Sequence, residues 1–201
     1  MSKSAVELFL RAKNHFSEMT AKTNEQFQRA ISVCRDIYVK KMSDYGTSWR
    51  IMRPSSVTDQ IMIKAKRIRQ IEMSGQSRIN EGIRSEFIGI VNYAAMALIQ
   101  LDLGPADQPH MDTDEAARLY DEKIAAARAL MGDKNTDYNE AWRDMRVSSF
   151  TDIILMKINR TKEIENNAGH TIISEGVDAN YMDMINYALF ALIQIDEKAS
   201  E

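Results

Sequence analysis

The sequence is poor in the residues that most restrict or cross-link a protein chain. Its 201 residues include one cysteine, Cys34, and three prolines. A single cysteine excludes an intrachain disulfide and a zinc site built from spaced cysteine pairs. The glycine-rich motifs that cradle phosphates are absent too. The three histidines and Cys34 occupy positions that give no support to Ser-His-Asp or Cys-His catalysis.

Long apolar runs and a surplus of positive charge are also missing. The most apolar stretch, Tyr187 to Ile195, is about nine residues long, whereas a membrane span needs roughly 18. The formal net charge of -3 gives no reason to expect nucleic-acid binding, which requires a basic surface. The N-terminus lacks the apolar core of a signal peptide. We therefore expect a cytoplasmic protein that spans no membrane and has no strong nucleic-acid surface.

The residues that are abundant favour helices. Hydrophobic residues make up 44% of the chain, which is enough to bury a core. Alanine, methionine, isoleucine, lysine, arginine and glutamate recur, while glycine and proline are scarce. This composition predicts an all-α protein.

One feature of the order of residues stands out, which is an internal repeat. The segment that starts at Asp44 matches the segment that starts at Asp137, an offset of 93 residues, with the same Trp-Arg-x-x-Arg and Ser-Ser-x-Thr-Asp motifs. One inserted residue near Asn166 shifts the offset to 94, after which the segment from Ile79 matches the segment from Ile173. The match predicts two tandem copies of one helical unit.

The apolar spacing predicts about three helices in each copy. We expect an N-terminal helical segment in residues 1–26, a first repeat at 27–103, a linker at 104–112 and a second repeat at 113–201. The N-terminal helix should cover residues 5–19 and the next helix residues 24–42. Ser56 with Asp59, and Ser149 with Asp152, have capping-box spacing and predict the start of each second helix. The repeats should pack about a pseudo-twofold axis as one helical bundle.

Two charged residues fall on the apolar face of each second helix. Lys64 and Glu72 lie there in the first copy, and Lys157 and Glu165 lie there in the second. A buried charge is costly unless it is paired. Either these residues form Lys-Glu ion pairs between helices, or the lysines reach out to solvent, or they bind a ligand.

Arginine and tryptophan cluster close to these lysines in both copies. Guanidinium groups grip phosphate oxygens and an indole can stack on a base, so the cluster suits a nucleotide. In the alternative interpretation the tryptophans are core anchors that the arginines cover. The residues are Trp49, Arg50, Arg53 and Arg67 in the first copy and Trp142, Arg143, Arg146 and Arg160 in the second.

The third helix of each copy has a divided pair of acids. Glu86 and Gly89 in the first copy correspond to Asn180 and Asp183 in the second. Acids three residues apart share a helix face and can bind one divalent cation, although a solvated helix edge explains them too. Glu81 and Glu175, and also Asn92 and Asn186, occur in both copies.

The motifs Asp-Tyr-Gly-x-Ser-Trp, Lys-x-x-Arg, Glu-Gly and Asp-x-x-Asn-Tyr resemble those of the nucleotide-modification-associated domain family, from about Phe27 to Asp196. That family is distantly similar to the MazG-like all-α nucleoside triphosphate pyrophosphatases, which bind Mg²⁺ through Glu-x-x-Asp and Glu-Glu-x-x-Glu. The first of these motifs falls on Glu86 or Asn180 and on Gly89 or Asp183. The second motif has no match.

The resemblance implies a nucleotide-binding helical protein that cleaves a nucleoside triphosphate to a monophosphate and pyrophosphate with Mg²⁺ or Mn²⁺. Glu86 and Asp183 would hold the metal, and Glu81 and Glu175 would act in catalysis. Substrate would be bound by Lys64, Lys157, Asn92, Asn186 and the arginines and tryptophans named above. One composite site between the two copies would bring these residues together. The alternatives are a nucleotide-binding module without catalysis and a helical interaction protein, each able to form a homo-oligomer.

Overall fold

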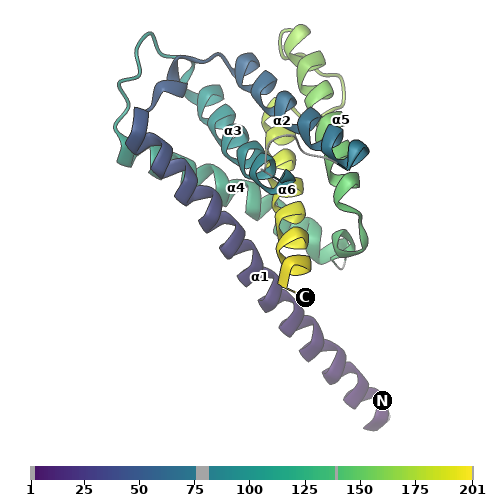
Figure 1. The fold of residues 1–201 in the computed structure, drawn as a ribbon. Coiled ribbons are helices and arrows are strands. Elements are labelled where there is room, and N and C mark those ends of the chain that lie inside the picture. The colour runs from purple at the N-terminus through teal and green to yellow at the C-terminus, as the bar shows by residue number, and fades with distance from the viewer. Residues whose placement is uncertain (1–2, 76–81, 139, 201) are drawn as a thin grey trace.

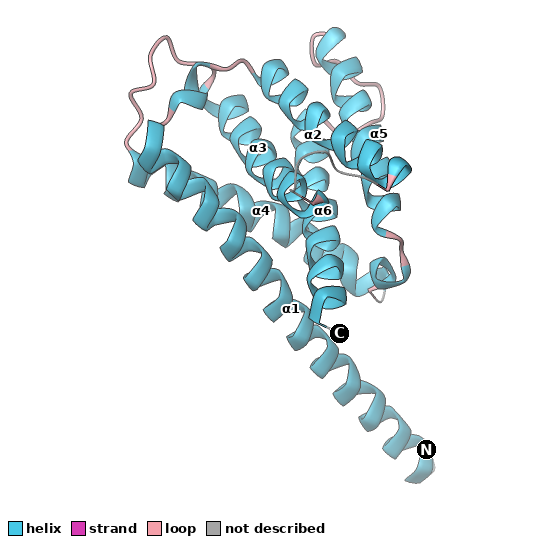
Figure 2. Cartoon of the chain, viewed as in Figure 1, coloured by secondary structure: helices cyan, strands magenta, loops and turns pink. Residues whose placement is uncertain are grey.

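The chain is all-α and is built from two tandem repeats. The computed structural model describes residues 3–75, 82–138 and 140–200, and the side chains of 21–75, 82–131 and 140–199. These residues form helices and loops and no strand (Figure 2). The first repeat contains α1 (Lys3–Tyr45), η1 (Ser48–Ile51), α2 (Pro54–Ser74) and α3 (Ile83–Leu103); the second contains α4 (Thr113–Tyr138), η2 (Ala141–Asp144), α5 (Val147–Asn166) and α6 (Val177–Ser200).

The N-terminal helix is longer than its spacing predicts. Residues 5–19 and 24–42 belong to one continuous helix, α1, whose N-terminal end extends beyond the other helices (Figure 1). The residues between the two expected helices, Thr-Ala-Lys-Thr at 20–23, include no glycine or proline to interrupt the turn. The N-terminal segment is therefore continuous with the first helix of the first repeat.

The second helix of each repeat begins earlier than its capping-box motif predicts. α2 begins at Pro54 and α5 at Val147, so Ser56 and Ser149 lie inside the first turn, and neither helix has a side-chain cap. Proline suits the first position of a helix, where its fixed φ fits and its missing N–H is not needed. At the other end α2 stops at Gly75, whose φ of 64° is left-handed.

Four helices form the centre of the molecule. α2 packs against α3, α5 packs against α6, and the two pairs meet through α3 with α6 and α2 with α5 (Figure 1). α1 and α4 lie against α3 and α6. The buried side chains of all these helices form one hydrophobic core. The α2/α3 and α5/α6 interfaces are therefore opposite sides of a four-helix bundle.

Reciprocal contacts between the repeats give the bundle its pseudo-twofold symmetry. Thr58 donates a hydrogen bond to Glu165 over 3.0 Å, and the corresponding Thr151 donates one to Glu72 over 3.0 Å. Two surface ion pairs, Asp59 with Lys162 at 2.6 Å and Asp152 with Arg69 at 3.8 Å, follow the same exchange. Each contact appears twice with the repeats interchanged, as a twofold axis requires.

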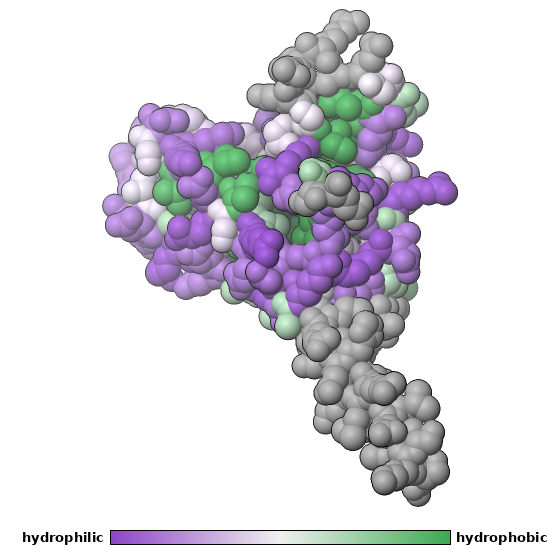
Figure 3. Space-filling view, turned by 60° about the horizontal axis from the view of Figure 1, so that its bottom comes forward, coloured by the Kyte–Doolittle hydropathy of each residue, from purple (hydrophilic) through white to green (hydrophobic). Residues whose placement is uncertain are grey.

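By length and composition alone, the central helix α3 could cross a membrane. However, 67% of its most apolar window is buried inside the protein, as in the core helix of a bundle. The face drawn in Figure 3 is mostly hydrophilic, with small hydrophobic areas between polar side chains.

Candidate functional site

A carboxylate on α3 holds two cations of α2 in the first repeat. The Glu86 side chain is 6% exposed, and its two oxygens contact different partners. Arg67 donates to Oε1 over 2.5 Å, and Lys64 donates to Oε2 over 3.3 Å. Both cations of the first repeat are therefore held by one buried acid from the neighbouring helix.

Gly89 makes the reach of Lys64 possible. The lysine side chain lies across this glycine, and a Cβ atom there would come within 2.5 Å of Lys64 Cε. Beyond the glycine the ammonium group lies 5.7 Å from the centre of the Tyr93 ring. The absent side chain lets Lys64 extend over α3 to Glu86, one turn nearer the start of the helix.

The acid sits one turn later in the second repeat. Asp183, which corresponds to Gly89, pairs with Lys157 at 2.5 Å between α5 and α6. Asn180 takes the place of Glu86, and its amide donates to the carbonyl oxygen of Gly176 over 2.8 Å. Each repeat thus keeps a lysine–carboxylate pair between its second and third helices, but the carboxylate comes from a different turn.

This exchange changes the surroundings of Arg160. The corresponding Arg67 is bound to Glu86, whereas Arg160 is exposed and its side chain has no ion pair or hydrogen bond with the described residues. Instead, Arg160 lines a cavity of about 1110 Å³. An arginine with its donors free in a cavity is available to bind an anion.

The cavity lies between α5, the start of α6 and the segment that joins them, residues 167–176. Lys157, Arg160 and Glu175, all selected from the sequence, line it together with Asn180. Arg69 reaches it from α2 and pairs there with Asp152 at 3.8 Å.

Apolar side chains border the same cavity. Ile172 and Ile173 in the joining segment are 101% and 96% exposed. Adjacent exposed apolar side chains form a small apolar patch of the kind that can border a ligand site. Hydrogen-bonding side chains and an apolar border therefore occur in the same cavity. Sequence reasoning missed these isoleucines and His170, although the inserted residue near Asn166 shows where the second repeat departs from the first.

The two tryptophans do not offer a face to a base. Trp49 and Trp142 are only 6% and 5% exposed and belong to the core. Trp142 stacks on Phe190 with ring centroids 4.6 Å apart, and Trp49 lies 6.4 Å from Tyr38. The expectation of base stacking is corrected in favour of the core-anchor alternative, because a buried ring has no free face.

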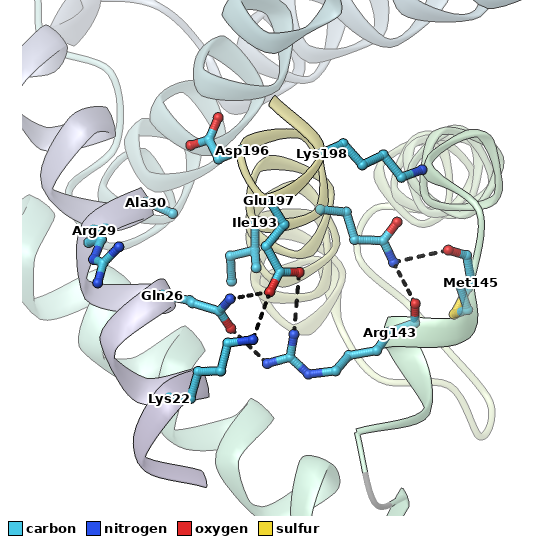
Figure 4. Close-up of a pocket in the computed structure, with 11 residues that line it drawn as sticks. Lys22, Gln26, Arg29, Ala30, Arg143, Met145, Ile193, Asp196, Glu197 and Lys198 are labelled. Carbon is cyan, nitrogen blue, oxygen red and sulfur yellow. Dashed lines mark hydrogen bonds and ion pairs between the residues drawn. The ribbon is translucent and has the colours of Figure 1, made fainter. Parts of the chain in front are cut away.

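The arginines that follow the tryptophans fasten the short η helices to the bundle. Arg50 is buried and donates to the carbonyl oxygen of Gly104 over 2.9 Å. Arg143 lies over the ring of Trp142 at 4.3 Å and bonds to Glu140 at 2.6 Å and to Gln26 at 2.7 Å. Figure 4 shows Arg143 beside Gln26 and Glu197 at the edge of a second cavity of about 600 Å³.

The remaining arginines of the motif neither line the cavity nor hold an η helix against the bundle. Arg53 and Arg146 are exposed at the N-caps of α2 and α5, and their side chains make no ion pair or hydrogen bond with the described residues. Arg146 lies at the opposite end of α5 from the joining segment. Neither arginine lines the cavity of Arg160.

Asn92 and Asn186 are structural. Both are buried in the third helix of their repeat. Asn92 donates to the carbonyl oxygen of Cys34 over 3.0 Å, and Asn186 donates to that of Ala127 over 2.9 Å. They connect α3 to α1 and α6 to α4, which leaves them no access to a ligand.

The expected metal pair is not assembled. Glu86 and Asp183 belong to two separate ion pairs on opposite sides of the bundle, so they do not share a composite site. No three or more of the described His, Cys, Asp and Glu residues lie together as metal ligands do. Glu81 lies outside the described residues, and Glu175 is exposed in the cavity. Bound Mg²⁺ or Mn²⁺ stays a prediction.

Glu72 and Glu165 do not pair with Lys64 and Lys157. Their carboxylates accept hydrogen bonds from threonines of the opposite repeat, and Tyr181 also donates to Glu165 over 3.3 Å. Burial raises the pKa of both carboxyl groups, an effect that the threonine hydrogen bonds oppose. These two residues join the repeats and are not part of the cavity.

Comparison with known proteins gives a single kind of match. The model of a family described as "Nucleotide modification associated domain 1" matches residues 41–101 and 134–195, one segment in each repeat. No curated protein and no solved structure matches the chain.

Proposed function

The chain belongs to the nucleotide modification associated domain 1 family, and we propose that it binds a nucleotide in the cavity of its second repeat. The observation that carries this proposal is the state of Arg160. The residue lines a cavity of about 1110 Å³ and is released from the ion pair that holds its counterpart in the first repeat.

The phosphates of the nucleotide would lie against the α5 wall. Arg160 presents a planar fork of donors that matches two phosphate oxygens. Lys157 has three N–H donors, so it can keep Asp183 as a partner and still donate to a phosphate. Asn180, from the start of α6, adds a neutral amide in place of a carboxylate that would repel the ligand.

The base would lie against the joining segment. Ile172 and Ile173 are exposed on the same cavity and offer a flat apolar contact that the ligand would remove from water. Glu163 and Glu175 also line the cavity and can accept hydrogen bonds from sugar hydroxyls. This set of contacts supports a complete nucleotide better than an inorganic phosphate.

Hydrolysis to a monophosphate and pyrophosphate is the second candidate activity. Glu163 and Glu175 are carboxylates in the cavity that favour it, since a divalent cation is bound through oxygen ligands. Against it stand Glu86 and Asp183, which already neutralise lysines. We therefore place binding before catalysis, and the resemblance to MazG-like enzymes stays a prediction.

Thermal melting and calorimetry with ribonucleotides and deoxyribonucleotides test the proposal. A nucleotide at a hundred times its Kd stabilises the fold by about 2.7 kcal/mol, which raises the Tm of a chain of this size by roughly 5 to 10 °C. The substitution Arg160→Gln should weaken binding about tenfold to a hundredfold, because it removes charged hydrogen bonds.

Arg118→Gln is the matched control, because Arg118 is an exposed arginine on α4 whose partners are Glu115 and Glu122. It should bind nucleotide like the unmodified chain. No shift with any nucleotide would refute the proposal. Pyrophosphate release that depends on Mg²⁺ or Mn²⁺ and stops with EDTA would establish the hydrolase instead of simple binding.

A further inference from the structure

The first repeat contains the same basic pair as the proposed ligand site but in a closed form. Lys64 and Arg67 correspond to Lys157 and Arg160, and both are bound by Glu86. We propose that Glu86 is a built-in substitute for the ligand anion, so that the first repeat is a latent nucleotide-phosphate site closed by its own carboxylate. This inference rests on the function proposed for the second repeat.

The contacts of Glu86 are those of a bound anion. Its two oxygens are divided between a guanidinium at 2.5 Å and an ammonium at 3.3 Å. A phosphate group bridges arginine and lysine in the same way, with one oxygen for each cation. The carboxylate is buried, so an incoming phosphate would have to displace it from both partners.

Gly89 also contributes to the closed form of the first-repeat site. Lys64 crosses the α3 backbone at a residue without a side chain, where a Cβ atom would displace the end of the lysine from its present path to Glu86. In the second repeat Asp183 fills that position and holds Lys157 there. The lysine of the second repeat is thereby kept one turn away from Asn180, and among the described residues Arg160 makes no counterpart of the Arg67–Glu86 ion pair.

The two exchanged positions together carry the same charge in each repeat. Glu86 with Gly89 and Asn180 with Asp183 each contribute one negative charge beside one lysine and one arginine. What differs is the turn that carries the charge. The exchange therefore separates a closed site from an open one without altering the net charge of the protein.

The double substitution Glu86→Asn with Gly89→Asp transplants the second-repeat arrangement into the first. Lys64 gains an acid at residue 89, its long side chain can move away from the new Cβ, and Arg67 loses Glu86. Calorimetry with ATP should then give two bound nucleotides per chain, where the unmodified chain binds one. The reverse exchange, Asn180→Glu with Asp183→Gly, should abolish ATP binding while Tm without ligand stays within a few degrees.

The two variants serve as each other's control, because both keep the net charge. If the unmodified chain binds no nucleotide, the proposed function fails. If it binds one and the Glu86→Asn, Gly89→Asp variant still binds one with a cooperative melt, the latent site is refuted and the proposed function stands. Two nucleotides on the unmodified chain would also refute it. If the forward variant does not fold, the reverse exchange decides, since retained ATP binding there overturns the inference.

Discussion

At the scale of single residues, position on a helix turn matters more than residue type. Glu86 and Asp183 are both acids that neutralise a lysine between two helices. Because they lie one turn apart in the aligned repeats, only Glu86 also binds the neighbouring arginine. Each repeat lacks one acid of the expected pair. The remaining acid still pairs with the lysine, but from a different turn of the helix.

Glu165 gives a prediction about pH. Burial raises its pKa above the ordinary value of 4.5, so the folded protein binds this proton more tightly than the unfolded chain. The stability contributed by that proton is present below pH 4.5 and is lost as the pH rises through the folded pKa. Glu165→Gln should therefore remove part of the fall in unfolding free energy as the pH rises above about 4.5, as urea denaturation would measure.

A suitable control is Glu122→Gln, because Glu122 is an exposed carboxylate of α4 that pairs with Arg118. It should leave the pH profile almost unchanged. An equal slope for the Glu165→Gln variant and the unmodified chain would mean that Glu165 titrates alike in the folded and unfolded states.

At the scale of elements, one glutamine fixes the entry to the second helix in each repeat. Gln194 on α6 donates to the carbonyl oxygens of Trp142, Arg143 and Met145 at 2.9, 3.2 and 3.0 Å. Gln100 on α3 makes the equivalent bonds to Trp49, Arg50 and Met52. In the second repeat the amide thus supplies a donor to the carbonyl groups of Arg143 and Met145, while that of Trp142 also accepts from the backbone N–H of Met145.

Gln194→Leu should destabilise the protein by about 1 to 3 kcal/mol, because the carbonyl groups of Arg143 and Met145 lose this donor. Chemical denaturation would measure the change. Gln70→Leu provides the comparison, since Gln70 is exposed on α2. A Gln194→Leu variant no less stable than Gln70→Leu would show that η2 is held by other contacts.

At the scale of the whole molecule, neither repeat buries its own apolar surface completely. α6 packs against α3 of the other repeat as well as against α5, and α1 contributes Phe27, whose ring lies 5.6 Å from Phe190 of α6. The apolar faces that one repeat would expose are those that the other covers. The pseudo-twofold core is therefore a condition of folding.

A chain of residues 113–201 alone should fail to give a stable monomer. Separation would expose the α6 surface that α3 buries, and a single repeat has too little core to compensate. Circular dichroism and size-exclusion chromatography would show loss of cooperative melting or self-association. Supplying residues 1–112 in trans should restore the melt. A half-chain that is monomeric and melts cooperatively would contradict the prediction.

The sequence was sufficient for the repeat, the all-α class and the set of basic residues, because helical spacing and internal similarity are properties of order along the chain. Lys157, Arg160 and Glu175 could be selected in this way. Burial could not be predicted from the sequence, since the same Trp-Arg motif is compatible with a surface or a core position until the neighbouring helices are placed. The structure decided that Trp49 and Trp142 are core residues.

What the sequence determined by itself is which residues the two copies keep and which they exchange. What only the tertiary structure decided is what the exchange does: whether Glu86 faces a cation, a metal or water depends on which helix packs beside α3. The physical reason is that an ion pair forms over a few ångströms between helices, and its geometry depends on the register of packing. With that register, Glu86 binds the basic pair on α2, whereas Arg160 on α5 faces a cavity.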